Sequence, residues 1–435
     1  MSLIKIEDLF HFEKGVLQSS KCIEGEYDFI TAASEWKTNN EYTHNCEALV
    51  FAAAASGSLG RTHYVNGKFI SSDLCFIITP KDPKNYPIDL KFYHIIFNEL
   101  KNDIVKNTKA GTSKEAIGMK SFGNYYLPYF EIKKQIEIKL QFENMQSTKI
   151  GIEEELSHQL SLIKQLRQAF LREAMQGLLV KTETNGETGA ELLEKIKAEK
   201  AQLIKEKKLK KEKELPPISE EEIPFEIPEH WTWCRLGEVA YITSGSTPSK
   251  DAFVEDGIPY LKMYNLRNQK IDFQYKPQYI KEEVHNGQLK RCRAYSGDVI
   301  MNIVGPPLGK IAVIPENLPE CNFNQAAVLI RPLIKSMNFF IFWYLNEMSE
   351  INAIDTKGVA GQANISVTQS HNMKIPLPPL NEQQQIVTKL DELMAFCDGL
   401  EESVKASQGV NEKLLQEVLR EALQGEGDVR KVVEE

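Results

Sequence analysis

Two long stretches of the chain place apolar residues three and four positions apart, which is the spacing of one face of an α-helix. In the first stretch, which predicts one long helix or a closely spaced pair, these residues are Ile132, Ile136, Leu140, Leu156, Leu160, Ile163, Leu166 and Phe170. In the second they are Ile386, Leu390, Leu393, Cys397, Leu400, Val404, Leu414 and Val418. Alternating steps of four and three are typical of a coiled-coil seam, so we expect these side chains to contact another helix or a partner protein.

Two polar residues, Ser407 and Asn411, interrupt the second seam between Val404 and Leu414. A polar seam residue lowers stability, but it can fix the register and the choice of partner helix. The alternative is that this pair is a tolerated weak point in the seam.

The two helical stretches are copies of each other. The segment QAFLREAMQG at 168–177 returns as QEVLREALQG at 416–425, and the pattern Gln-Ile-x-x-Lys-Leu occurs at 135–140 and again at 385–390. Proline-containing segments at 127–130 and 375–380 precede the helices, and glycines at the ends of both repeats favour helix termination. A helix of about 45 residues is roughly 65 to 70 Å long, so we expect a scaffold that holds two modules apart.

The sequences before the two helices differ from each other but have the same texture. Each has short β-rich runs (48–52 and 75–79; 299–304 and 326–330) followed by an aromatic, helix-like segment (92–100; 339–348). This pattern predicts two diverged α/β (α+β) modules that alternate with two long helices, paired as an antiparallel coiled coil with an internal pseudo-two-fold. The predicted domains are 1–126, 127–215 (helical spacer with a Lys-rich segment), 216–374 and 375–435 (second helical spacer).

A charged segment lies between the first helix and the second module. Residues 190–214 are predicted to form a helix that ends in the lysine-rich run 205–213, and a Pro-rich stretch from 215 to 230 marks the next boundary. Such a run is usually a solvated face. The alternative is that it contacts nucleic-acid phosphates or an acidic partner.

Composition narrows the class of protein. The longest apolar runs are too short for a membrane span, and the N-terminal residues have no signal-peptide pattern, so we expect a cytoplasmic protein. Seven scattered cysteines give no zinc or disulfide pattern, and the sequence indicates no metal site. A net charge of −9 disfavours a protein that coats nucleic acid by charge alone, but not one that reads bases through a few local contacts.

An ordered set of short motifs carries a resemblance to a known family. They are WTWCRLGEV at 231–239, GSTP at 245–248, SGDV at 296–299 and LPPLNEQQQI at 377–386, with AELLEKIKAE at 190–199. Together with the helical repeat, they make the chain closely resemble the specificity subunit of type I restriction-modification systems. The first module lacks the Trp-x-Trp-x-x-Leu-Gly opening and has LFHFEKG at 9–15 instead, although GTSKEAI at 111–117 fits.

The resemblance implies a mechanism for double-stranded DNA recognition. Each module would read one half of a split, asymmetric site, and the helices would set the unread gap. Methylation subunits, two in number, would dock on the helices and bring S-adenosylmethionine to an adenine in each half-site. Restriction subunits would add ATP- and Mg-dependent cleavage, so this chain itself would carry no catalysis and no cofactor.

Candidate DNA contacts are polar and basic residues in loops of each module, because Asn and Arg suit base edges and Lys suits phosphates. In the first module they are Ser56, Ser58, Arg61, Lys109, Thr112 and Lys114. In the second they are Ser244, Ser246, Thr247, Lys250, Lys262, Tyr264, Asn265, Arg267, Lys357, Gln362 and Asn364. The alternative for all of them is an ordinary solvated loop.

Enzyme motifs fail on inspection. The loop GPPLGK at 305–310 has too short a spacing for a phosphate loop, and its prolines remove backbone donors. Two rivals to DNA recognition within a type I system stay open: a coiled-coil adaptor whose modules bind protein, and the specificity subunit of a related type IIB-like system that cuts on both sides of its site.

Overall fold

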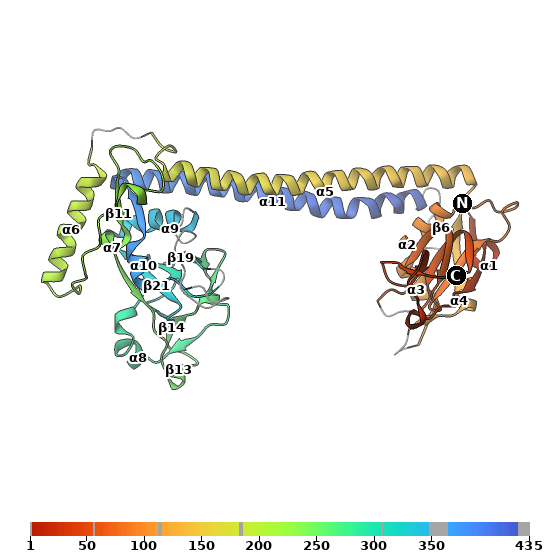
Figure 1. The fold of residues 1–435 in the computed structure, drawn as a ribbon, viewed down its shortest axis with the longest axis horizontal. Coiled ribbons are helices and arrows are strands. Elements are labelled where there is room, and N and C mark those ends of the chain that lie inside the picture. The colour runs from red at the N-terminus through yellow and green to blue at the C-terminus, as the bar shows by residue number, and fades with distance from the viewer. Residues whose placement is uncertain are drawn as a thin grey trace. The chain divides into compact units, whose positions relative to one another are not determined.

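The computed structural model describes residues 2–54, 57–111, 115–181, 186–305, 308–347 and 364–424, with side chains up to residue 413. Its elements confirm the predicted α/β class with two long helices (Figure 1). The chain divides into two compact units, Met1–His158 with Val404–Glu435, and Gln159–Ser403. Among the described helices, none has a stretch that is both long and apolar enough to cross a membrane.

The first module is built on a six-stranded sheet. It opens with β1 (Ser2–Lys5), α1 (Ile6–Leu9) and β2 (Phe10–Lys14). The sheet order is β2-β7-β5-β6-β3-β4, with β3 Tyr27–Ile30, β4 Lys37–Asn39, β5 His44–Ala52, β6 Thr62–Ser71 and β7 Cys75–Pro80. After the sheet come α2 (Leu90–Glu99), α3 (Lys101–Thr108), β8 (Lys109–Ala110), β9 (Ala116–Ile117), α4 (Met119–Gly123) and β10 (Tyr126–Tyr129), which pairs with β1.

Side-chain alternation along β5 explains why this sheet is buried on both faces. Leu49 and Phe51 point to the face on which α2 packs, where they join Phe92 and Phe97 in one apolar cluster. The intervening Val50 belongs to a separate cluster on the other face. Successive strand residues point to opposite faces, so a continuous apolar run such as this one favours a fully buried strand.

The second module contains two four-stranded sheets. It opens with β11 (Thr232–Arg235), α7 (Leu236–Val239) and β12 (Ala240–Ser244). The first sheet has the order β12-β21-β18-β19, with β18 Val299–Asn302, β19 Ile311–Val313 and β21 Ala327–Pro332. The second has the order β13-β17-β14-β20, with β13 Phe253–Val254, β14 Ile258–Leu261, β17 Tyr279–Ile280 and β20 Asn322–Phe323. Its other elements are the hairpin β15 (Leu266–Arg267) and β16 (Lys270–Ile271), α8 (Glu282–Asn286), α9 (Asn338–Glu347), α10 (Val367–Asn372) and β22 (Lys374–Leu377), which pairs with β11.

The two modules share one framework despite their different sequences. In each, the opening strand pairs antiparallel with the closing strand in the same register, Ile4 opposite Leu127 and Cys234 opposite Ile375. The strand order β2-β7-β5-β6 also matches β12-β21-β18-β19, with every neighbour antiparallel. The first module therefore has the same opening as the second, although its sequence lacks the tryptophans that mark it.

The glycine that follows the second strand of each framework has a packing reason. A Cβ on Gly15 would lie 2.1 Å from the carbonyl oxygen of Ser72, and one on Gly245 would lie 2.2 Å from that of Asn324. Backbone meets backbone at both places, so a side chain cannot be accommodated without displacing the strand.

The long helices are α5 (Ile132–Met175) and α11 (Leu380–Gln424). Each begins shortly after its closing strand, and each has a buried glutamine in its first turn. Gln135 Nε2 donates to the carbonyl of Phe130 (2.7 Å), and Gln383 Nε2 donates to that of Pro378 (2.9 Å). The two copies therefore align with Gln135 opposite Gln383. The Gln-Ile-x-x-Lys-Leu match instead aligned Gln135 with Gln385, so it is out of register by two residues.

The end of α5 is capped as the sequence predicts. Gly177 adopts a φ of +71°, the amide of Leu178 donates to the carbonyl of Glu173 (2.8 Å), and the amide of Gly177 donates to that of Ala174 (3.2 Å). These two bonds define a Schellman cap, whose left-handed position favours glycine. The equivalent Gly425 lies outside the described residues.

Contacts between the two helices run antiparallel, as expected. Arg167 of α5 pairs with Asp398 (2.7 Å) and Glu401 (2.9 Å) of α11, while Leu171 and Met175 share an apolar cluster with Leu390 and Met394. Moving toward the C-terminus of α5 therefore means moving toward the N-terminus of α11 within this unit.

The seam of α11 differs from its sequence pattern. Leu390, Cys397, Val404 and Asn411, which are seven residues apart, are buried, and so is Met394. The intermediate seam positions are more open: Leu393 is half-buried, Leu400 is 36% exposed and Ser407 is exposed. On α5, Leu156 and Ile163 are buried, whereas Leu160 and Phe170 are half-buried. Ile386 is buried, and Leu414 and Val418 lie outside the described side chains.

Asn411 confirms the expectation of a polar residue within the helix contact. It is 4% exposed, and its Nδ2 donates to the carbonyl oxygen of Lys149 in α5 at 3.2 Å. Ser407 does not share this burial, so the predicted polar pair is reduced to a single buried amide.

Helix α6 (Gly189–Lys205) is shorter than predicted. It packs on the second module through Leu192, Leu193 and Ile196, and Thr188 caps its start by accepting from the amide of Glu191. The helix ends at the first lysine of the predicted run 205–213, because charged residues without an apolar face have nothing to pack against. The chain then continues as a strap, residues 206–230, along the same module (Figure 1).

Candidate DNA-recognition surface

The turn after β12 is fixed by a hydrogen bond from a buried tyrosine, and some of its polar residues are exposed. Tyr260 is fully buried, its hydroxyl donates to the carbonyl of Ser246 (2.9 Å), and burial raises its pKa to about 12. Ser244 and Ser246 are half-buried, whereas Thr247 and Lys250 are exposed. Of the four predicted residues in this turn, the last two have exposed side chains, although Thr247 Oγ1 also lies 3.4 Å from the hydroxyl of Tyr260.

The following loop uses one predicted residue for its own structure. Asn265 is 1% exposed; its Oδ1 accepts from the amide of Lys262 (2.9 Å), and its Nδ2 donates to the carbonyls of Asp272 (3.0 Å) and Tyr275 (2.9 Å). Loop-forming asparagines bond their neighbouring backbone in this way. The amide that suits an adenine edge is therefore turned inward.

A small hairpin, β15–β16, brings aromatic and basic groups together. Asn268 and Gln269 connect its strands with φ values of +48° and +56°, as a two-residue hairpin of the type I′ class requires. The guanidinium of Arg267 lies 4.1 Å from the ring centroid of Tyr275, and both side chains remain partly exposed. Gln269 Oε1 accepts from the amide of Ile311 (2.9 Å), which fixes the hairpin against the neighbouring loop.

The predicted residues near this hairpin therefore differ in availability. Lys262 is half-buried, with its Nζ 5.5 Å from the ring of Phe253, and the hydroxyl of Tyr264 donates to the carbonyl of Lys276. Sequence reasoning missed Lys270 and Tyr275, which complete the exposed cluster around Arg267. The only signal for them was an asparagine between two very short apolar runs, which is weak evidence for a hairpin.

Asn364 is the one described member of the third predicted loop. It forms an isolated bridge with Val304, and its Oδ1 is buried with no hydrogen-bond partner among the described residues. Lys357 and Gln362 lie outside the described residues.

In the first module, the described candidates are held by their own surroundings. Arg61 donates from Nη1 to the carbonyl of Ala32 (2.9 Å) and to Ser58 Oγ (3.2 Å), and Lys109 pairs with Glu115 at 2.7 Å. Ser56, Thr112 and Lys114 lie outside the described residues. Arg61 thus organises its loop, whereas Lys109 is exposed in a surface ion pair that is easily exchanged.

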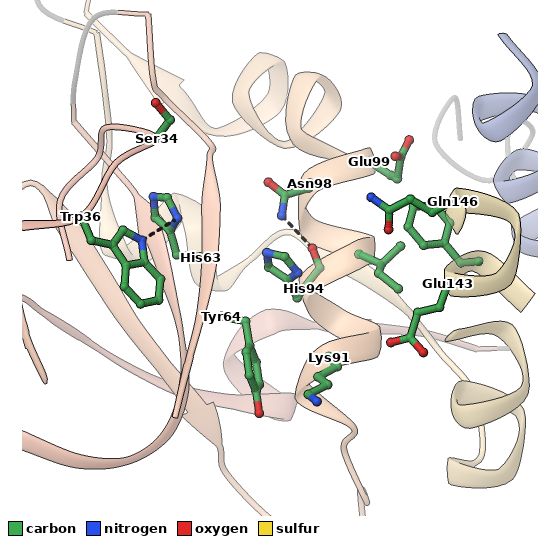
Figure 2. A pocket seen from close by; sticks show the side chains of 12 residues that line it. Ser34, Trp36, His63, Tyr64, Lys91, His94, Asn98, Glu99, Glu143 and Gln146 are labelled. Atoms are coloured by element: carbon green, nitrogen blue, oxygen red, sulfur yellow. Dashed lines mark hydrogen bonds between the residues drawn. The ribbon is translucent and has the colours of Figure 1, made fainter. Parts of the chain in front are cut away.

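A pocket of the first module lies between α2, β6 and α5, and none of its residues was a predicted contact (Figure 2). Trp36 Nε1 donates to His63 Nδ1 (3.2 Å), so the proton of a neutral His63 sits on Nε2, which faces the carbonyl of Ala33 at 2.9 Å. Burial lowers the pKa of His63 and that of His94. The pocket is therefore lined by neutral imidazoles and an indole, with Lys91 and Glu99 at its edge.

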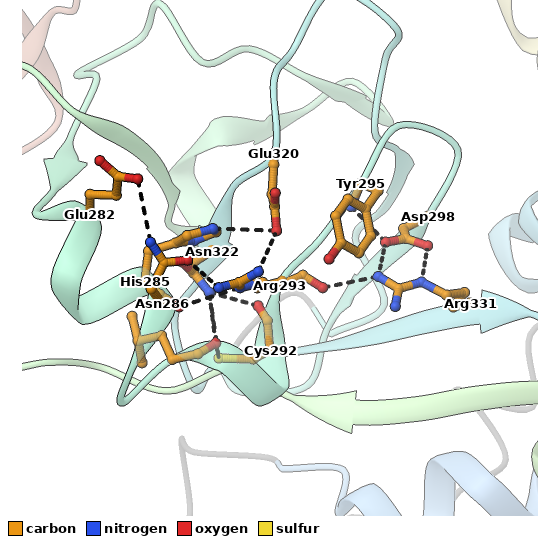
Figure 3. A network of polar contacts seen from close by, with 11 residues as sticks. Glu282, His285, Asn286, Cys292, Arg293, Tyr295, Asp298, Glu320, Asn322 and Arg331 are labelled. Carbon is orange, nitrogen blue, oxygen red and sulfur yellow. Dashed lines mark hydrogen bonds and ion pairs between the residues drawn. The ribbon is translucent and has the colours of Figure 1, made fainter. Parts of the chain in front are cut away.

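The ionic groups inside the second module pair with one another (Figure 3). Arg331 binds Asp298 through two nitrogens (2.7 and 2.6 Å), and Arg293 lies 3.5 Å from Glu320. Asn322 Nδ2 donates to the carbonyls of Leu289 (3.1 Å) and Cys292 (3.0 Å), so its Oδ1 accepts from His285 Nδ1 at 2.6 Å. These charges are paired inside the module, whereas the side chain of Arg267 is 47% exposed and its ion pair with Asp272 is long, at 3.9 Å.

Comparison with known proteins explains the duplicated framework. The sequence profile of the type I restriction modification DNA specificity domain matches residues 1–162 and 228–407. Each match contains one module and most of the long helix that follows it.

The chain belongs to this family.

Individual relatives agree with the profile. The chain is 33% identical over 252 residues to the specificity subunit of the type I restriction enzyme EcoAI of Escherichia coli, which covers 56% of this chain and 42% of that protein. It is 23% identical to the EcoDI specificity subunit of E. coli over 97% of this chain and 88% of the other. The matched part thus spans less than half of the EcoAI protein, and likewise 43% of the EcoEI subunit.

Solved structures share the fold of the whole chain. The HsdS subunit from Thermoanaerobacter tengcongensis superposes with a TM-score of 0.60 at 16% identity, covering 98% of this chain and 97% of that one. A chain from a study of complex assembly in the type I R-M system gives 0.66 at 16% identity, with 98% of both chains covered. At this identity the likeness concerns the fold.

Proposed function

We propose that this chain is the non-catalytic, DNA-reading subunit of a type I restriction-modification complex. The observation that carries the proposal is the family match, which occurs twice and each time takes in a module together with its helix. Each module reads one half of a split, asymmetric DNA site, and the paired helices set the number of unread base pairs between the halves.

In the second module the reading surface is the cluster around β15–β16. Arg267 is the best placed residue for a base edge, because an arginine fork donates two hydrogen bonds to guanine, and stacking on Tyr275 holds it in one orientation. Thr247 and Lys250 lie on the turn after β12. Both are exposed and suit phosphate or base contacts.

Partner subunits supply the chemistry. Methylation subunits, one for each half-site, dock on the helices and bind S-adenosylmethionine, and restriction subunits bring ATP, Mg²⁺ and cleavage. Apolar side chains left exposed on the helices support this docking: Ile136 (40%) and Leu140 (50%) on α5, and Phe396 (59%) on α11. Single exposed apolar residues are ordinary, but several along helices that already pair with each other suit a further helix or protein face.

Mapping methylated adenines across the genome, in cells with and without this gene, tests the proposal. The expected result is one split motif whose methylation depends on the gene. If no methylated motif depends on the gene, the proposal is wrong. If the chain then retains partner proteins without selecting any DNA sequence, the coiled-coil adaptor is favoured. Cleavage on both sides of the site by the purified complex would indicate the type IIB-like system.

Substituting Arg267 tests the assignment of the reading surface. In Arg267→Ala, discrimination at one base pair of one half-site should fall by about 1–3 kcal/mol, and the other half-site should stay unchanged. The control is Lys290→Ala, which removes an exposed positive charge from the same module outside the loop. Equal loss at both half-sites would show that the substitution acts on folding rather than on reading.

A further inference from the structure

The lysine-rich run folds into a tight turn, residues 205–213, which we call the lysine turn. It follows α6 directly: the amide of Lys207 donates to the carbonyl of Ile204 (3.0 Å), and that of Lys208 donates to the carbonyl of Leu203 (2.9 Å). This is the same cap that ends α5, but its left-handed position is occupied by Lys207 (φ +58°) instead of glycine. A lysine there costs more conformational energy than a glycine would.

The lysines of this segment divide into paired and unpaired groups. Lys208 pairs with Glu206 (2.8 Å), and on α6 Lys200 pairs with Glu212 (2.8 Å). Within the described part of the chain, five exposed lysines form no ion pair or side-chain hydrogen bond: Lys205, Lys207, Lys210, Lys211 and Lys213. Favourable interaction with the helix C-terminus explains one or two lysines in the last turn, but it does not extend to those beyond it.

The flanks of the turn are anchored to the second module, so the turn itself protrudes from a fixed base. Before it, Lys200 Nζ donates to the carbonyl of Gly237 (2.6 Å). After it, the guanidinium of Arg235 donates to the carbonyls of Pro216 (3.1 Å) and Pro217 (3.3 Å) and pairs with Glu222 (3.0 Å). The unpaired charges are therefore held at one place on the module rather than on a free tail.

We propose that the lysine turn binds the phosphate backbone of DNA without reading its sequence. This inference rests on the proposed function, because it requires DNA on the second module. Lysine is a point charge that suits phosphates, and the turn has no arginine or aromatic side chain with which to read a base. Its only apolar residue, Leu209, is half-buried, so it lacks the exposed apolar anchor that the centre of a protein interface needs. A protein of net charge −9 gains most from a local patch of this kind.

The test measures DNA affinity against salt concentration for the full-length chain with its methylation subunits. The variant Lys210→Gln/Lys211→Gln removes two unpaired lysines. The control Lys195→Gln/Lys197→Gln removes two lysines of α6 that lie outside the turn and are already paired, with Glu187 and Glu238; their side chains are 70% and 41% exposed. The probes are a duplex several helical turns long that carries the methylated motif, and a scrambled duplex of equal length.

Each phosphate contact contributes about 0.9 to the slope of log affinity against log salt, so the variant should flatten the slope by about 2 on both duplexes. The control should leave it within error of the wild-type slope. The inference is overturned if variant and control give the same slope, or if the variant loses methylation subunits instead of DNA affinity. Failure of the proposed function looks different: the wild-type complex itself would not prefer the duplex with the motif.

Discussion

Each module opens with a two-stranded ribbon, β1 with β10 in the first and β11 with β22 in the second. The two ribbons have very different surroundings. In the second module, β11, β22 and α7 lie beneath α6 and the strap, and Gly237 allows a close approach: a Cβ there would lie 2.7 Å from His371 Nδ1 and 3.0 Å from Leu215. In the first module the equivalent of Gly237 is Glu7, which pairs with Lys5 at 3.5 Å at the surface. The same backbone therefore occurs with a cover, where glycine allows the close approach, and without one, where a glutamate stands at the same position.

A second difference lies between the second and third strands of the shared framework. In the first module this connection adds β3 and β4 to the edge of the main sheet, with β3 parallel to β6. In the second it is longer and contributes three of the four strands of a separate sheet, together with the hairpin that carries Arg267. The two modules therefore share the framework and differ in this connection, and in many scaffolds the binding residues lie on such loops.

Breaking the strap should produce the largest effect. Arg235 is 5% exposed, donates hydrogen bonds to three backbone carbonyls and pairs with Glu222. Arg235→Ala leaves these buried acceptors unpaired, so it should lower the free energy of unfolding of the second module by about 3 kcal/mol. The equivalent Lys5→Ala in the first module breaks a surface pair and should cost about 0.5 kcal/mol. Hydrogen exchange of β11 and β1 amides measures each ribbon locally. Equal losses of stability in the two variants would contradict the idea that only the second ribbon depends on the strap that covers it.

The two framework glycines should behave alike. Gly15→Ala and Gly245→Ala each force a methyl group against a carbonyl oxygen, so each should destabilise its own module by about 1–3 kcal/mol in urea unfolding. Gly151→Ala is the control, because a Cβ there meets nothing within 4 Å and alanine favours the helix. If only one of the two substitutions strongly lowered the stability of its module, the two frameworks would be less similar than their shared strand order suggests.

Acid should weaken the first module in a way that depends on His94. Burial lowers the pKa of His63 and of His94 in the folded state, so on acidification the unfolded chain takes up protons first, near pH 6.5. Stability is therefore present above pH 6.5 and falls as the pH drops below it, by less than about 1 kcal/mol per pH unit for each partly exposed histidine.

His94→Gln keeps a donor for the carbonyl of Thr62 and should flatten this pH dependence. Exchange of β6 amides between pH 7 and pH 5 provides the measurement, with Lys91, Glu99, Glu143 and Arg61 as the charged groups nearby. An unchanged slope in the variant would remove His94 as a cause.

The smallest effect concerns the helices. The residue of α5 that corresponds to Asn411 is Ile163, and both are buried. Asn411 Oδ1 has no hydrogen-bond partner among the described residues, so Asn411→Ile should raise the free energy of unfolding by about 1 kcal/mol. If the asparagine fixes the register and the proposed function holds, complexes that contain the variant should also methylate sites with altered spacing, which sequencing of modified DNA would detect. Lower stability would show that the bond to Lys149 contributes more than the burial of the amide costs.

Several elements could be predicted because their signals are local. The extent of α5 and its glycine cap follow from apolar periodicity and from the one residue type that readily adopts a left-handed conformation. The buried strands β5 and β21 follow from continuous apolar runs. The proline-containing segments before the two long helices predict only where those helices begin. The structure forms strands β10 and β22 there, because a proline can lie in a short two-stranded ribbon.

The candidate site was harder, because residue type says what a side chain can bind but not where it points. Arg267 and Asn265 lie two residues apart and both suit base recognition, yet one is exposed against Tyr275 and the other is buried in hydrogen bonds to its own loop. The two long helices, the duplication and the family could be predicted, since each depends on periodicity or on ordered motifs. Which polar groups are bonded inside the modules could not, because that depends on which backbone carbonyls the folded chain brings within reach of each side chain.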